Sequence, residues 1–206
     1  MNGRRLSALA VLALAIPLVA APLVAVGAPT GTPDFPGGHY ALDPKHASLI
    51  ARVKHMGVSL YTLRFDTLDA NFDYDPSRPE STRLTASVDP TSLDVNADYG
   101  KQFAEEFLSV SKFPKATFVA TSMQKTGDGQ GTMTGDLTLM GVTKPVTFNV
   151  TLVGAGHEVL PIPFGRHAAG FEATATIKRS DFGSTYLNNL VGDEVVLQIE
   201  AEFEKK

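Results

Sequence analysis

The chain has 206 residues, contains no cysteine and carries a formal net charge of −4. Without cysteine there can be no disulfide and no thiolate metal ligand, so a hydrophobic core must hold the fold alone. An acidic chain without a basic run is a poor candidate for nucleic-acid binding, and we expect no nucleic-acid partner.

The first residues predict an export signal. Two arginines precede an apolar stretch, Leu6–Val26, that ends in small residues. This arrangement is typical of a signal peptide, and we expect cleavage after Ala28. The alternative is an uncleaved anchor, because a run of about 20 apolar residues is long enough to span a bilayer. Two prolines interrupt the run and favour cleavage.

Cleavage defines the mature protein and its compartment. Removing residues 1–28 from the 206 leaves 178 residues with 16 basic and 22 acidic ones, a net charge of −6. We expect this product in the periplasm or secreted, without stable membrane insertion. Residues 29–38 hold three prolines and predict a flexible leader. Residues 39–206 have the size of one domain with a full core.

Alternating apolar and polar residues dominate the chain from His39 onward. The clearest such segments are Ala47–Val53, Leu68–Tyr74, Leu84–Val88, Phe171–Ile177 and Val195–Phe203. A period of two is typical of strands with one buried face. Turns rich in Pro, Gly and Asp separate about eight such segments, which predicts a sandwich or a closed barrel. Only Lys101–Leu108 and Ser180–Asn189 have the pattern of short helices.

The segment Gly135–Leu152 predicts a β-hairpin. Apolar residues alternate with threonine and asparagine on both sides of Gly141, which suits a tight turn. Pro145 lies at the start of the second strand, where its missing N–H costs least. We expect an antiparallel pair with one face in the core and the other in water.

No motif of an activated catalytic centre is found. The chain lacks G-x-S-x-G, a phosphate loop and a dinucleotide fingerprint, so we expect no enzyme activity and no cofactor. Its five histidines lack the close spacing of a zinc site, so we expect no metal. His46 and His55 either bond to the backbone or to Asp43, or contact a ligand head group. Arg179 either forms an ion pair or turn with Asp181 or contacts the ligand.

Six segments, in order, resemble the YceI-like family of lipid- and polyisoprenoid-binding proteins. They are Tyr40–Ser48 (Y-x-(I/L)-D-P-x-H-S), Val53–Ser59 (V-K-H-L-G-V-S), Lys112–Phe118 (K-Y-P-x-x-x-F), Gly135–Val146 (G-x-L-T-x-x-G-V-T-K-P-V), Gly170–Gly183 (G-F-x-A, then I-x-R-S-D-F-G) and Val191–Val195 (V-G-D-E-V). Their order and spacing along 39–203 make accidental agreement very improbable.

The resemblance implies an all-β protein: a single antiparallel lipocalin-like β-barrel with one or two short helices. Its apolar tunnel would hold a long-chain isoprenoid, quinone- or prenol-like, or a similar amphiphilic lipid, without covalent chemistry. His46, His55 and Arg179 are then candidates for contacts with the head group. The expected tunnel wall includes Phe65, Phe72, Phe118, Phe148, Phe171, Ala173 and Ala175. Small residues on an inward face leave room for a ligand, unless they pack against larger partners across a filled core.

The chain departs from the family pattern at three places. Leu63 and Ala70 stand where the family usually has glycine, and Tyr99–Glu106 replaces its D-x-H-L segment. If this segment shapes the mouth of the tunnel, the ligand differs in this member. The fold is therefore transferred more safely than the identity of the ligand.

Alternative functions remain open at the level of sequence. A lipid-acting barrel enzyme would draw its polar groups from Asp43, His46 and Arg179. A haem-binding barrel would use His46 or His55 as axial ligand. An envelope stress protein whose ligand is only structural filler is a further alternative. The sequence also leaves open the head group, the tail length, a homodimer and the delivery partner.

Overall fold

The computed structural model describes residues 34–206 except residue 96 and residues 158–165. The predicted signal peptide, its cleavage site and residues 29–33 of the leader lie outside these residues. The strands are β1 (Gly38–His55), β2 (Ser59–Phe65), β3 (Leu68–Tyr74), β4 (Arg83–Val88), β5 (Leu93–Asp94), β6 (Ala116–Gly127), β7 (Gln130–Leu139), β8 (Val142–His157), β9 (His167–Lys178) and β10 (Val191–Lys205). The helical elements are α1 (Gly100–Leu108) and the 3₁₀ turns η1 (Pro79–Ser81), η2 (Pro90–Ser92) and η3 (Arg179–Phe182).

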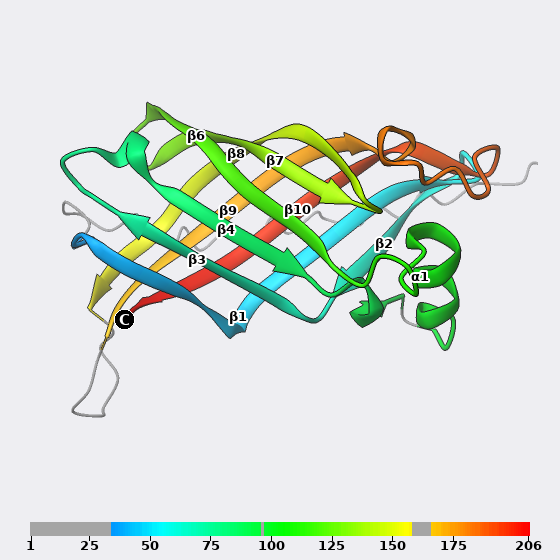
Figure 1. Ribbon diagram of the computed structural model, residues 1–206, viewed down its shortest axis with the longest axis horizontal. Helices are drawn as coiled ribbons and strands as arrows, with labels where there is room; N and C mark the ends of the chain where they lie inside the picture. The colour runs from blue at the N-terminus through cyan, green and yellow to red at the C-terminus, as the bar shows by residue number, and fades with distance from the viewer. Residues whose placement is uncertain (1–33, 96, 158–165) are drawn as a thin grey trace, which may run out of the picture. The chain divides into compact units, whose positions relative to one another are not determined.

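The strands form one antiparallel sheet that closes on itself (Figure 1). The sheet order is β10-β9-β8-β7-β6-β4-β3-β1-β2-β5, and β10 also pairs with β1. Because β2 and β3 pair with different parts of β1, they share one position in the ring, as β4 and β5 share the next. The result is a closed barrel of eight strand positions with one α-helix, which confirms the predicted fold class.

Strand β1 bends where it changes neighbours. Its first residues pair with β3 between Gly38 and Ala41, and its later residues pair with β2 between Leu49 and His55. The register with β10 shifts between Leu42 and Ala47. Such an irregularity increases the local bend, which a barrel needs in order to close.

The predicted hairpin is present as β7 and β8. Met140 and Gly141 connect the strands with positive φ angles of 52° and 75°, a pair that matches the right-handed twist of the flanking strands. Val146 and Phe148 are buried, whereas Thr147 between them is exposed. Strand β8 begins at Val142, so Pro145 lies inside it rather than at its start.

The two predicted helices differ in outcome. Lys101–Leu108 lies within α1, whose Ala104 is buried against Leu93 and Val95. Ser180–Asn189 forms no α-helix, since η3 ends at Phe182 and turns follow. None of the helices in the described ranges has the length and apolar character needed to cross a membrane.

The end of the leader is packed against the barrel, which corrects the expectation that all of residues 29–38 are flexible. The ring of Phe35 stacks on Tyr74 with 4.1 Å between centroids and meets Tyr40 edge-on at 5.1 Å. The hydroxyl of Tyr40, a fully buried residue, donates to the carbonyl of Pro36 at 2.8 Å. These contacts, of which the one with Tyr74 is long-range, pack the leader from Phe35 onward against the barrel.

Candidate functional site

The interior of the barrel holds two adjoining apolar cavities. The first has a volume of about 220 Å³ and the second a volume of about 420 Å³. Both walls include Leu49, Val88, Ala116, Leu137 and Leu197, so the cavities meet inside the barrel. Apolar cavities of about 150 Å³ stay dry in other proteins and bind small apolar molecules. The interior can therefore accommodate an apolar ligand.

Most of the predicted tunnel residues line one of these cavities. Phe65 lines the second cavity. The first cavity is lined by Phe72, Phe118, Phe148, Phe171 and Ala173. Ala175 is instead buried in the core cluster around Phe118 and Phe148 and borders neither cavity. The two inward alanines therefore differ. Ala173 borders cavity space, whereas Ala175 packs against larger side chains of the core.

Helix α1 and Tyr99, which directly precedes it, contribute an aromatic wall to the second cavity that was not predicted from the sequence. Tyr99, Phe103 and Phe107 all line this cavity. Neighbouring rings in this row lie 6.0 Å and 5.8 Å apart, and Phe107 meets Tyr186 edge-on at 5.1 Å. A spacing of four residues places side chains on one helix face, and this was the signal available in the sequence.

Arg179 borders the second cavity, yet its guanidinium mainly holds the backbone. Its side chain donates four hydrogen bonds to main-chain carbonyls. Of the two arrangements expected with Asp181, the structure has the turn, η3, and no ion pair joins these two described residues. The acceptors are the carbonyls of Ser184, Tyr186, Val191 and Gly192, at 2.9–3.0 Å. The guanidinium also lies 5.8 Å from the centre of the Phe107 ring. Burial lowers the pKa of Arg179, but an arginine stays charged, so this cation ties the segment before β10 to the barrel.

His55 is the second predicted polar residue that reaches a cavity. It is an exposed residue at the end of β1 and lines the second cavity beside Tyr61, with 5.7 Å between ring centroids. The hydroxyl of Tyr61 donates to the carbonyl of Val95 at 3.0 Å. With Ser184, His55 and Arg179 give the second cavity a polar border that includes an imidazole and a guanidinium, whereas the polar lining of the first cavity consists of hydroxyl side chains such as Thr82, Ser87 and Thr117.

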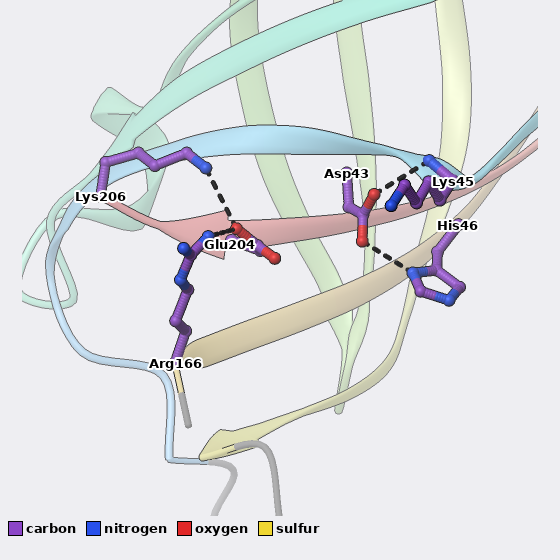
Figure 2. Close-up of polar contacts among 6 residues, drawn as sticks. All are labelled: Asp43, Lys45, His46, Arg166, Glu204 and Lys206. Atoms are coloured by element: carbon purple, nitrogen blue, oxygen red, sulfur yellow. Dashed lines mark hydrogen bonds and ion pairs between the residues drawn. The ribbon is translucent and has the colours of Figure 1, made fainter. Parts of the chain in front are cut away.

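His46 lies elsewhere, in a polar cluster that borders neither cavity. Its side chain is 63% exposed, and Nδ1 lies 2.7 Å from Asp43 Oδ2 (Figure 2). The Asp43 carboxylate also accepts the backbone N–H of Lys45 at 2.9 Å. His46 is thus bonded to Asp43, which is one of the alternatives that the sequence left open. His46 therefore does not belong to the wall of either cavity.

The histidine spacing did not predict one feature of this cluster. Asp43, His46 and Glu202 each offer a ligand atom, and these atoms lie within 4.8 Å of one another. Strand β10 brings Glu202 to β1 across the closing seam, a contact that no sequence spacing reveals. His46 thus has two carboxylate neighbours that the sequence spacing did not reveal, and the expectation of no metal stays a prediction. Exposed acidic groups of this kind are common without a metal ion.

Asp43 should make stability depend on pH. The backbone N–H of Lys45, followed by His46, lowers the pKa of Asp43. A carboxyl with a lowered folded-state pKa stabilises the fold above its ordinary pKa of about 3.9 and loses this contribution as the pH falls through the lowered value. Asp43→Asn should therefore flatten the acid limb of the stability curve, by less than about 1 kcal/mol. Urea unfolding at a series of pH values checks this, and parallel curves would contradict it.

Comparison with known proteins gives three levels of similarity. The family model of the YceI-like domain matches residues 40–203. A UPF0312 protein of Pseudomonas aeruginosa (strain LESB58) is 38% identical over 167 residues, covering 79% of this chain and 85% of that protein. The crystal structure of Burkholderia cenocepacia BcnA has a TM-score of 0.67 and 25% identity, covering 78% of this chain and 98% of that one.

One further structure is similar in fold. A polyisoprenoid binding domain from Saccharophagus degradans, implicated in plant cell wall breakdown, has a TM-score of 0.57 and 14% identity. The match covers 81% of this chain and 98% of that domain. At this identity the likeness concerns the barrel itself.

Proposed function

The chain belongs to the YceI-like family, and from this premise we propose that it is an exported carrier of a long-chain isoprenoid, quinone- or prenol-like, or of a similar amphiphilic lipid. The observation that carries the proposal is the pair of adjoining apolar cavities, of about 220 and 420 Å³, inside a closed barrel. The polyisoprenoid-binding description of a protein with the same fold supports it.

Burial of the tail supplies the affinity in this proposal. Each CH₂ group removed from water contributes about 0.8 kcal/mol, so a long tail binds well without polar anchors. The first cavity, with its phenylalanine and alanine wall, suits such a tail. A carrier needs shape and an apolar surface, and it needs no activated nucleophile.

The polar border of the second cavity indicates how the ligand is oriented in the barrel. His55, Arg179 and Ser184 lie along this cavity, whereas the first cavity is lined almost wholly by apolar side chains. We therefore place the head group in the second cavity and the tail in the first. In this arrangement His55 and Arg179 make weak polar contacts with the head group, while burial of the tail supplies most of the affinity.

The enzyme and haem alternatives have less support. The enzyme alternative needs Asp43, His46 and Arg179 together, but only Arg179 borders a cavity. Of the two candidate axial ligands for haem, His46 and His55, only His55 borders a cavity. The visible spectrum of the purified protein separates haem from a colourless lipid, and we expect no Soret band.

The three departures from the family pattern all fall on cavity walls. Leu63 and the Tyr99–Glu106 segment, through Tyr99 and Phe103, border the second cavity, and Ala70 borders the first. Leu63 and Ala70 stand where the family usually has glycine, so their side chains take up cavity space that is free in members with glycine. We expect the ligand to differ from that of other members in the fit of its head group.

Export is part of the proposal. The basic start, the apolar Leu6–Val26 run and the small residues before Pro29 support a cleaved signal peptide. We expect mass analysis of the protein from its own host to give an N-terminus near Pro29 in the periplasm or the medium. A full-length chain found in the membrane fraction would contradict this part and leave the barrel's binding role to be tested separately.

Filling the first cavity should block the ligand. Ala173 lines this cavity, so Ala173→Phe places a ring where the tail lies and should abolish uptake of a long prenyl alcohol. Overpacking costs about 1–3 kcal/mol, so retained folding is checked by circular dichroism. The matched control is Thr176→Phe, which changes an exposed residue of the same strand. Equal uptake by the two folded variants would show that the tail does not lie beside Ala173.

A further inference from the structure

One end of the barrel carries most of the exposed large hydrophobic side chains. Of the ten such side chains in the part of the chain that the structure describes, seven lie near the β1–β2 turn, before α1 or between η3 and β10. They are Met56, Val58, Leu60, Tyr99, Tyr186, Leu187 and Leu190, and we call them the apolar rim. The remaining three are valines on β6, β8 and β10.

The rim segments are joined to one another. The N–H of Met56 donates to the carbonyl of Leu190 at 2.7 Å, which links the β1–β2 turn to the segment before β10. Phe107 of α1 meets Tyr186 of the same segment at 5.1 Å. Figure 1 shows α1 and this segment at the same end of the barrel. Single exposed hydrophobics are ordinary, but a gathered set marks an interaction surface.

The apolar rim is continuous with the second cavity. Tyr99 and Leu187 line that cavity, although they are 57% and 39% exposed. Val58, beyond the cavity, is 88% exposed. Apolar surface thus runs from the outside of the barrel into its interior. Exposing the tail of a long-chain lipid to water costs much free energy. A continuous apolar path lowers this cost while the lipid enters or leaves the cavity.

We propose that the apolar rim docks on the surface of a lipid bilayer, so that a lipid passes directly between the bilayer and the second cavity. This inference rests on the proposed function, because it assumes a lipid ligand. Charges of both signs border the rim, with Asp98 and Lys101 beside Tyr99. Docking therefore comes from shallow insertion of apolar side chains rather than from attraction to anionic head groups, and salt should change it little.

Flotation with phosphatidylcholine vesicles tests the docking. The test variant is Val58→Asp with Leu60→Glu, because these rim residues are well exposed and border neither cavity. The matched control, Val119→Asp with Val153→Asp, introduces the same charge at exposed valines of β6 and β8. We expect the wild type to float with vesicles at low and high salt, the rim variant to bind about tenfold more weakly or worse, and the control to stay within about twofold.

A second measurement separates this inference from the proposed function. Geranylgeraniol is offered either in detergent micelles or in vesicles, and uptake by each protein is followed. The rim variant should load from micelles as the wild type does and load slowly from vesicles. A wild type that loads from micelles but does not float with vesicles, or a rim variant that floats equally well, overturns the docking alone. Flotation that requires a membrane protein in the vesicle also overturns it, in favour of a protein partner. Failure to load from either source overturns the carrier function itself.

Discussion

Affinity for prenyl alcohols should rise steeply with chain length and then level off. Each added CH₂ contributes about 0.8 kcal/mol while cavity remains to be filled, so one isoprene unit of five carbons should increase affinity by about two to three orders of magnitude. The rise should stop when the tail fills the first cavity, of about 220 Å³, because we place the head group in the second. Competitive titration of a length series in detergent-free buffer, at concentrations at which each alcohol stays monomeric, measures this dependence. Affinity that does not change with length would contradict tail burial as the source of binding.

The polar residues supply the control for this titration. His55→Ala should weaken binding by no more than a hydrogen bond, about 0.5–1.5 kcal/mol for a neutral partner. His46→Ala should leave it unchanged, because His46 borders neither cavity. Loss of binding in a folded His46 variant would contradict this placement of the ligand and would indicate that the Asp43, His46 and Glu202 cluster takes part in binding.

Arg179→Met should be strongly destabilising. The substitution removes four hydrogen bonds to carbonyls between Ser184 and Gly192 and leaves at least the acceptor of the buried Ser184 without this partner. With about 1–3 kcal/mol for each acceptor left unsatisfied, and some of them reached by water, we expect a loss of about 3 kcal/mol or more in the free energy of unfolding. Urea denaturation measures the loss. Arg179→Lys should not rescue it, because three donors on one nitrogen cannot reach four carbonyls.

Arg52→Met is the matched control for Arg179. Arg52 is exposed on β1, and surface substitutions of this kind usually change stability by less than about 0.5 kcal/mol. Similar stability of the two methionine variants would show that the Arg179 bonds contribute little. A destabilised Arg179 variant that still loads lipid at low temperature would assign Arg179 to the fold rather than to the ligand.

The barrel was predictable because its pattern is local. Alternation in β8, β9 and β10 gives the strands, and Gly141 gives a turn, whatever the rest of the chain does. Strand β2 was missed because Leu60, 64% exposed, lies next to the inward series of Tyr61, Leu63 and Phe65 and masks the period of two.

The site was only partly predictable because its contacts are long-range. The phenylalanines of the wall followed from strand alternation and family resemblance. The partners of Arg179 come from a segment between η3 and β10 that has no regular structure, so no periodicity indicates them. Phe35 stacks on Tyr74, 39 residues away in the chain, and no local pattern indicates this contact. The same holds for the meeting of Asp43 with Glu202 across the β1–β10 seam.

The most direct test of the carrier function is native mass spectrometry of the protein purified from the envelope of its own host without detergent. We predict a population that carries one long-chain prenyl or alkyl amphiphile, released chemically unaltered by organic extraction and absent from folded Ala173→Phe. A protein that emerges empty and stays empty when offered prenyl alcohols, or a ligand that is recovered chemically altered, would contradict the account.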